Sequence, residues 1–251
     1  MKVIFKGQVP KDLSYPESME DAMAFSTDDA RIAISDGASE SFDSKTWAQL
    51  IVENFVLDTS VSDHWLVALA NRFAANFDLA SLSWSKAAAF ERGSFATLLG
   101  IENFQTFNDV KISSVGDCLA VLLDGIELIK TFPYDSYEQF QQRPHLFCSN
   151  LADNKFFQDP SFYTDHQTYW NLDSLSSPRI LCMTDALGEW ALRKAAEGNP
   201  QWDFLLDIST SDMLKDFVVS ERANRSMKVD DVTLVSISFD RVDDNNELPI
   251  S

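Results

Sequence analysis

The stretch Ile32-Ala33-Ile34-Ser35-Asp36-Gly37 is a compact apolar run that ends in an aspartate and a glycine. An apolar run followed by turn-forming residues is typical of a strand that enters a turn. The arrangement recurs along the chain, because apolar runs lead to Asp117 and to Asp185, whereas Asp230 and Asp231 open one. The sequence therefore predicts several strands whose ends carry carboxylates.

The segments around these strand ends are short apolar runs and longer amphipathic stretches. Apolar residues recur at helical spacing from Trp47 to Phe55 and again from Trp65 to Phe77, which predicts two helices lying on an apolar surface. Two further helices are expected over 186–197 and 211–222, and the expected strands cover 2–6, 22–25, 32–34, 95–101, 110–115, 119–123, 126–129, 179–184 and 232–239. Because Asp124-Gly125 is a hairpin signal, we expect the four runs between 95 and 129 to form one antiparallel meander. This order of elements predicts an α+β layered domain and not a βαβ repeat.

We expect residues 1–239 to form a single domain, since the sequence has no internal repeat and no linker-like stretch. Within it, 131–178 is rich in aromatic residues but has little periodicity, which favours an irregular insertion over one edge. Its aromatic pairs either pack the insertion against the domain or present a docking surface to a partner. The last residues, 240–251, are acidic, and we expect a frayed tail there.

The composition narrows the possible partners. The chain has 251 residues, of which 45% are hydrophobic, and 39 acidic against 20 basic residues give a formal net charge of −19. Such a field repels nucleic acids and anionic membrane surfaces, so neither is an expected partner. The cysteines are far apart and form no CxxC pair, which argues against a zinc ribbon and a disulfide framework. The start of the chain has no signal-peptide pattern, and the expected location is the cytoplasm.

Carboxylates at successive strand ends can form a metal-binding site if these ends lie close together in the fold. One aspartate at a strand end is usually a turn or cap residue. Repeated occurrence, including Glu20-Asp21 before the run 22–25, indicates an oxygen-only site suited to Mg²⁺ or Mn²⁺. Gathered carboxylates repel one another without a cation, so convergence implies a metal. A protein nucleophile is not expected, because Gly37-Ala38-Ser39-Glu40-Ser41 departs from GxSxG and the histidines form no metal-binding pair.

Taken in order, the motifs resemble those of the metal-dependent Ser/Thr protein phosphatases (type 2C, the PPM family), with this chain as a divergent, bacterial-type member. The matching elements are Met19-Glu20-Asp21-Ala22, Ser35-Asp36-Gly37-Ala38, Gly93-Ser94-Phe95-Ala96-Thr97, Val115-Gly116-Asp117-Cys118, Met183-Thr184-Asp185-Ala186-Leu187 and Val229-Asp230-Asp231-Val232-Thr233. Each motif is weak by itself. Together, over about Glu20 to Phe239, their order makes the resemblance specific.

The resemblance implies a four-layer α-β-β-α sandwich, in which two antiparallel sheets pack face to face between helices and two divalent cations, Mn²⁺ or Mg²⁺, bind at one end. The implied metal ligands are Glu20, Asp21, Asp36, Gly37, Asp117, Asp185 and Asp230. Asp36 would bridge the cations with help from the Gly37 carbonyl. Asp185 and Asp230 would complete one site. The other site would use Glu20, with Asp21 acting through water.

The resemblance also implies an activity. Asp36, Asp185 and Asp230 are the implied catalytic residues, and water activated between the cations would hydrolyse phosphomonoesters on Ser or Thr of a phosphoprotein. Asp117, together with Asp185, matches the place where some members bind a third, weaker ion. A signalling role opposite a partner Ser/Thr kinase follows from the same resemblance.

The sequence departs from the family pattern where the phosphate is gripped. The usual arginine before the acidic pair is missing, since its place falls near Pro16, and Lys11 is the candidate substitute. Ala38 stands where some members carry a histidine, and Ala186 replaces the glycine of Ser-Asp-Gly. These departures leave open a catalytically weak or inactive phosphatase-like regulatory or binding module, and an acidic cation-binding protein without enzyme ancestry.

Overall fold

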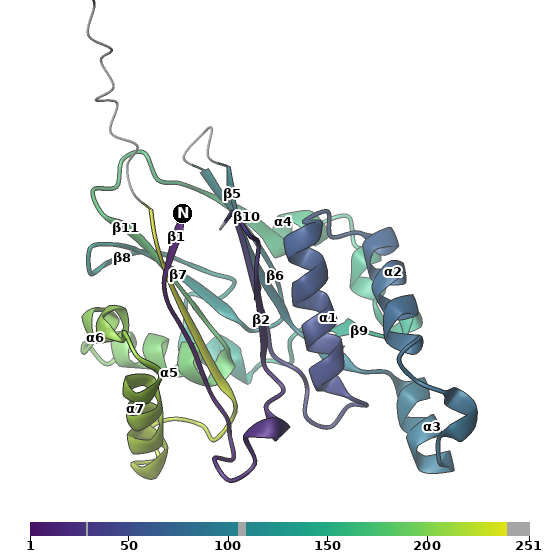
Figure 1. Ribbon diagram of the computed structural model, residues 1–251. Coiled ribbons are helices and arrows are strands. Elements are labelled where there is room, and N and C mark those ends of the chain that lie inside the picture. Colours follow the sequence, from purple (N-terminus) through teal and green to yellow (C-terminus); the bar gives the residue numbers. More distant parts are fainter. Residues whose placement is uncertain (29, 105–108, 240–251) are drawn as a thin grey trace, which may run out of the picture.

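The described residues form two five-stranded antiparallel sheets. The computed structural model describes the chain except residues 29, 105–108 and 240–251. One sheet has the order β1-β12-β11-β7-β8 and the other the order β10-β6-β5-β3-β2, while β4 pairs with β9 in a short ribbon. In Figure 1, α5, α6 and α7 lie outside the first sheet, and α1 and α2 lie outside the second. The predicted fold, two antiparallel sheets flanked by helices, is confirmed.

The strand bounds follow the order of the sheets. The first sheet consists of β1 (Lys2–Val9), β12 (Val232–Ser238), β11 (Pro178–Met183), β7 (Leu119–Asp124) and β8 (Glu127–Phe132). The second consists of β10 (Gln167–Asn171), β6 (Asp109–Val115), β5 (Leu98–Phe104), β3 (Arg31–Ser35) and β2 (Ala22–Phe25). The ribbon consists of β4 (Phe95–Ala96) and β9 (Phe147–Cys148).

Polar side chains cap the first turns of some of the helices, among them α1 and α2. The α-helices of the described residues are α1 (Ser44–Leu57), α2 (Asp63–Ala74), α3 (Trp84–Arg92), α4 (Phe162–His166), α5 (Asp185–Ala196), α6 (Trp202–Asp207) and α7 (Ser211–Ala223). The 3₁₀ helices are η1 (Pro16–Ser18), η2 (Leu79–Ser81), η3 (Tyr137–Gln141), η4 (Leu151–Asp153) and η5 (Lys155–Gln158). The side chains of Asp43 and Ser62 accept hydrogen bonds from the backbone of the first turns of α1 and α2, as N-caps do.

The strand that carries Asp36 lies between two apolar layers. Ile32 and Ile34 of β3 belong to the core between the sheets, whereas Ala33 faces the helices α1 and α2. Strand β7 alternates in the same way, since Leu122 joins the core between the sheets and Leu123 packs on the side of α5. Both faces of the central strands are covered, which explains why they read as continuous apolar runs and not as alternating patterns.

The predicted meander over 95–129 is wrong in its pairing. β5 pairs with β6, and β7 pairs with β8, but β6 and β7 belong to different sheets. The chain crosses between the sheets at Gly116-Asp117-Cys118, where Gly116 has a φ of 111° that favours glycine. A Cβ at Gly116 would lie 2.5 Å from the Thr97 side chain. The sequence does not distinguish this crossing from a hairpin, because both use a short turn with glycine. The crossing brings Asp117 to the end that the two sheets share.

The segment 131–178 differs from the irregular insertion that the sequence indicated. It contains β9, α4 and β10, and β10 is an edge strand of the second sheet that pairs with β6. Its buried and half-buried rings include those of Phe147, Phe156, Phe157, Phe162 and Trp170. Tyr163 and Tyr169 remain exposed. Most of the aromatic residues therefore pack the segment against the core, which was the first of the two expected roles.

Several element ends also differ from the prediction. β1 extends to Val9, because Gly7 and Gln8 continue the pairing with β12 although they interrupt the apolar run. The helices α3 and α6 were not predicted: α3 buries no residue and α6 is six residues long. The predicted tail, 240–251, lies outside the described residues. None of the helices in the described ranges has both the length and the apolar character that a bilayer span requires. The cysteines, all buried, are free thiols.

His166, at the end of α4, gives a test of this packing. Its Nδ1 lies 2.7 Å from the carbonyl oxygen of Ser114, and its ring centroid is 4.9 Å from that of Phe162. Burial holds the pKa of His166 below the ordinary 6.5, and His145 adds to the effect although the Ser114 carbonyl opposes it. The folded protein therefore takes up this proton less readily than the unfolded chain. Stability linked to His166 is present above the unfolded pKa and is lost as the pH falls below it.

We expect the stability advantage of the wild type over His166→Gln to shrink between about pH 7.5 and about pH 5.5. Urea unfolding at each pH measures it, and the same comparison with the exposed His64→Gln serves as the control. A difference between wild type and His166→Gln that stays constant over this range would show that the ring is not held in a buried, neutral state.

Candidate metal and phosphate site

The predicted convergence of strand ends is found at one end of the sandwich. A cavity of about 180 Å³ is lined by the carboxylates of Asp36 after β3, Asp117 between β6 and β7, Asp185 after β11 and Asp230 before β12. The other lining residues are Gly37, Ala38, Ser39, Thr97, Pro144, Leu146 and Lys228. The four acids are half-buried. Five of the seven predicted ligands, counting Gly37, thus border one cavity.

The segment Asp36–Ala38 is fixed by the neighbouring chain. The amide of Asp36 donates to Thr97 Oγ1 at 2.7 Å, and the amide of Thr97 donates to the carbonyl oxygen of Asp36 at 2.9 Å. Gly37 forms an isolated bridge with Ala96. A Cβ at Gly37 would lie 2.9 Å from the carbonyl oxygen of Glu20 and 3.0 Å from that of Ser44, so the close approach of three backbone segments requires glycine. The described residues donate no hydrogen bond to the Asp36 carboxylate.

Asp185 and Asp230 share a lysine. Lys228 Nζ lies 2.7 Å from Asp185 Oδ2 and 2.9 Å from Asp230 Oδ2. The other oxygen of each carboxylate is held by the backbone: the amide of Ala186 donates to Asp185 Oδ1 at 2.6 Å, and the amide of Asp231 donates to Asp230 Oδ1 at 3.0 Å. In both carboxylates, therefore, a backbone amide fixes one oxygen and the Lys228 ammonium contacts the other.

Asp21 is buried and does not line the cavity. Its Oδ2 accepts hydrogen bonds from the hydroxyls of Thr184 at 3.0 Å and Thr233 at 2.7 Å. Its Oδ1 is buried and has no hydrogen-bond partner among the described residues. Burial raises the pKa of Asp21 well above the usual range, and the charges of Asp231 and Asp185 act in the same direction. An unsatisfied buried carboxylate oxygen calls for a water or a cation.

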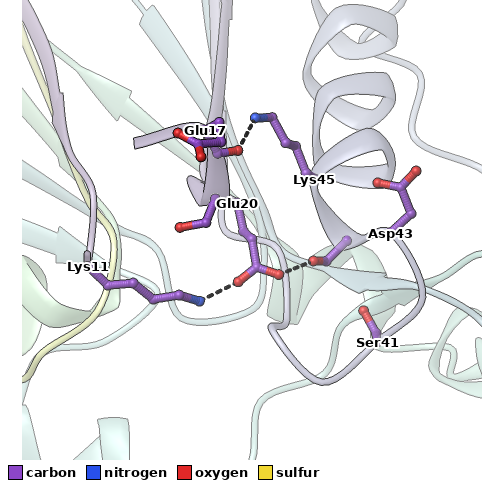
Figure 2. Close-up of a pocket in the computed structure, with 8 residues that line it drawn as sticks. Lys11, Glu17, Glu20, Ser41, Asp43 and Lys45 are labelled. Atoms are coloured by element: carbon purple, nitrogen blue, oxygen red, sulfur yellow. Dashed lines mark hydrogen bonds and ion pairs between the residues drawn. The ribbon is translucent and has the colours of Figure 1, made fainter. Parts of the chain in front are cut away.

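Glu20 faces a second cavity, of about 320 Å³, beside the first. Figure 2 shows its carboxylate paired with the ammonium group of Lys11. Ser39 connects the two cavities: it borders the first, and its hydroxyl lies 2.6 Å from Glu20 Oε2 and 2.6 Å from Lys11 Nζ. Burial alone would raise the pKa of Glu20, but the hydrogen bonds from Lys11, Ser39 and Ser44 hold it below its usual value. Glu20 is thus next to the cavity of four acids but does not line it.

The cavity carboxylates repel one another. Burial raises the pKa of Asp36 well above the usual range, and the charges of Asp21, Asp185 and Asp117 raise it further. Burial, followed by the charge of Asp185, raises the pKa of Asp117 to about 6. Burial also raises the pKa of Asp185, although Lys228 opposes this shift. The folded chain therefore gathers negative charge that one lysine neutralises only in part.

Two residues near the cavity were not predicted. Lys228 lies outside the matching motif, although it precedes Asp230 by only two positions. Asp231 is buried, and its two oxygens accept hydrogen bonds from the amides of Lys11 and Glu20, each at 2.7 Å. The Asp-Asp motif thus divides its roles, since Asp230 lines the cavity and Asp231 holds the chain beside it.

The residues fit a hard divalent cation in chemistry, because carboxylate and carbonyl oxygens are the donors that Mn²⁺ and Mg²⁺ prefer. As they stand, however, no three or more His, Cys, Asp or Glu side chains of the described ranges form a group that could hold a metal ion. Lys228 forms ion pairs with Asp185 and Asp230, and Lys11 forms one with Glu20. Threonine hydroxyls donate hydrogen bonds to Asp21. The predicted ligand set stays a prediction.

Several solved structures that share the fold are phosphatases. A substituted form of a bacterial serine phosphatase has 11% sequence identity and a TM-score of 0.58, with 94% of this chain and 98% of that chain covered. Serine/threonine phosphatase Stp1 from Staphylococcus aureus has 12% identity and a TM-score of 0.57, with 95% and 96% covered. The catalytic domain of the serine/threonine protein phosphatase PstP, solved with two manganese ions, has 16% identity and a TM-score of 0.55, with 95% and 99% covered.

No protein-family model matches the sequence, and no curated protein is significantly similar to it. At these identities the structural likeness establishes the fold. The resemblance that the sequence motifs indicated is confirmed at that level, over nearly the full length of the chain.

Proposed function

We propose that the protein is a metal-dependent phosphatase that hydrolyses phosphomonoesters on Ser or Thr of a phosphoprotein. The observation that carries the proposal is the cavity in which Asp36, Asp117, Asp185 and Asp230 meet. The matching fold supports it, and so does the PstP structure, which contains two manganese ions. On this proposal Asp36, Asp185 and Asp230 are the catalytic metal ligands, with the Gly37 carbonyl, Asp21, Glu20 and Asp117 assisting.

The chain's own residues prepare the cavity. When bound, two divalent cations lower the pKa of water and neutralise charge on phosphoryl oxygens. The Thr97 hydrogen bonds fix the position of Asp36, and its carboxylate is free of donors from the described residues. The backbone amides behind Asp185 and Asp230 orient their carboxylates. Because the carboxylates are already oriented in the folded protein, the free energy needed to bring them together is spent during folding and not during the reaction.

Hydrolysis of p-nitrophenyl phosphate with EDTA, Mn²⁺ or Mg²⁺ tests the proposal. We expect turnover that requires Mn²⁺ or Mg²⁺ and that is abolished by EDTA. A phosphoserine protein should be dephosphorylated under the same conditions. The absence of turnover on all of these substrates, with Mn²⁺ binding demonstrated by calorimetry, would overturn the enzyme and leave a cation-binding module.

The second candidate function is a catalytically weak regulatory or binding module. One observation favours it: Lys228 and Lys11 occupy carboxylates that the active phosphatase would use for cations. The metal dependence of the assay above separates the two functions, because a module that keeps both lysines in place would show no turnover at any metal concentration.

Lys11 is the candidate for the missing phosphate-gripping arginine. Its ammonium contacts Glu20 and Ser39, and Ser39 borders the cavity of four acids. Because hydrogen bonds to charged groups contribute more than neutral ones, we expect Lys11→Met to raise KM for p-nitrophenyl phosphate by about ten-fold, with a smaller change in kcat. Steady-state kinetics measures both constants.

Lys45 provides the matched control for this prediction. It lines the same second cavity, but its ammonium donates to the backbone carbonyl of Glu17 at 2.7 Å and is drawn beside Glu17, apart from the Lys11 ammonium (Figure 2). Lys45→Met removes an equal charge and should leave KM nearly unchanged. Equal effects of the two substitutions would assign the change to net charge and not to a contact of Lys11 with phosphate.

A further inference from the structure

The ammonium group of Lys228 lies where the cavity needs positive charge. It contacts one oxygen each of Asp185 and Asp230, at 2.7 Å and 2.9 Å, and these are the oxygens that the backbone amides leave free. Opposite charges at such distances attract strongly in a half-buried setting, where water screens them only in part. Lys228 therefore offsets part of the negative charge of Asp185 and Asp230 in the metal-free protein.

The loop that carries Lys228 is anchored on both sides of it. Met227 is buried, and its amide donates to the carbonyl of Glu221, while the guanidinium of Arg222 donates to the carbonyl of Asp230. Between these anchors the Lys228 side chain is 58% exposed. Its long, flexible stem can thus leave the carboxylates for solvent while the backbone stays in place.

We propose that Lys228 is a built-in counter-cation, which occupies Asp185 and Asp230 in the metal-free protein and must be displaced before a divalent cation binds there. The inference rests on the proposed function, because it assigns these two carboxylates to a metal. It goes further in naming a competitor within the chain. The observed affinity for the metal ion is then the difference between the binding free energies of the metal ion and of the Lys228 ammonium at the same carboxylates. The lysine therefore sets the concentration of divalent cation at which the protein becomes active.

Titration calorimetry with Mn²⁺ on three variants of the full chain tests the competition. We expect Lys228→Met to lower the Kd for Mn²⁺ by about ten-fold, since it removes the competitor, and Lys228→Arg to stay close to the wild type. Lys215→Met is the control, because Lys215 is exposed on α7 and does not line the cavity, so its removal changes only the net charge. Without metal, Lys228→Met should also melt several degrees below Lys215→Met, because two carboxylates then lack their counter-charge.

Acylation of the wild type followed by mass spectrometry supplies a readout that does not depend on a variant folding. Saturating Mn²⁺ should raise the labelling rate of Lys228 several-fold while that of Lys215 stays constant. An unchanged Lys228 rate at saturation would overturn displacement.

The possible failures are distinguishable. Equal Mn²⁺ affinity of wild type and Lys228→Met would overturn the competition and leave the metal-dependent phosphatase intact. Binding by Lys228→Met alone would support the competition and contradict an active wild-type enzyme. No binding by either protein would overturn the metal site and the inference with it.

Discussion

Replacing Asp36 by asparagine should have two effects of opposite sign. Asp36 is half-buried among other carboxylates, which raise its pKa together with the burial that is the largest cause. The substituted amide would keep the shape of the side chain and remove its negative charge, so we expect the metal-free protein to gain about 1 kcal/mol in the free energy of unfolding. The same change should weaken Mn²⁺ binding by about 100-fold or more, because a proposed metal ligand is lost.

Urea unfolding without metal and calorimetry with Mn²⁺ measure the two effects. Added Mn²⁺ should raise the melting temperature of the wild type by mass action, and Asp36→Asn should blunt this rise. Asp216→Asn is the control, because Asp216 is exposed on α7 and does not line the cavity. A variant that loses stability and keeps its Mn²⁺ affinity would show that Asp36 has a structural role and no metal.

Replacing Trp47 by alanine should destabilise the fold more than any other change considered. Trp47 is fully buried on α1, its ring centroid lies 5.4 Å from that of Phe73, and its Nε1 donates to the carbonyl of Phe147 at 2.8 Å. The substitution opens a large cavity and leaves that carbonyl without its donor. We expect a loss of about 3–5 kcal/mol, a large part of the stability of an ordinary domain.

The substitution should also disturb the metal and phosphate site, because Trp47 contacts a strand that is connected to it. Phe147 belongs to β9, β9 pairs with β4, and Ala96 of β4 forms a bridge with Gly37. Urea unfolding measures the stability, and Trp84→Ala is the control, since Trp84 is 87% exposed. Trp47→Phe should fall between the two. A loss below about 1 kcal/mol in Trp47→Ala would mean that α1 does not anchor this end of the sandwich.

The central strands and the convergence of acids could be predicted because their signals are local. Strand β3 is an apolar run that ends in Asp36-Gly37, and the apolar runs beside Asp117, Asp185 and Asp230 repeat the pattern. Where such strands pack in one sandwich, their ends meet at a common edge. The order of the motifs, more than any single one, indicated the fold.

The remaining features depend on contacts between distant residues. Whether Gly116-Asp117 forms a hairpin or a crossing depends on which sheet offers partners to β7, and one of its two partners, β11, lies far along the chain. Strand β10 has little apolar character, and its pairing with β6 defines it. The side-chain partners of Glu20 and Asp185 are lysines 9 and 43 positions away, which no motif of the chain records. Sequence patterns therefore located the acids but not their counter-charges.

Anomalous diffraction from crystals grown with Mn²⁺ tests the central claim most directly, since it locates the ion without reference to activity. We predict manganese peaks in the cavity, against the carboxylates of Asp36, Asp185 and Asp230, with the Lys228 ammonium moved away from both of its acids. Crystals of Asp36→Asn under the same conditions should lose these peaks. A wild-type cavity without manganese at saturating concentration, in which Lys228 still contacts Asp185 and Asp230, would contradict the proposed metal-dependent site.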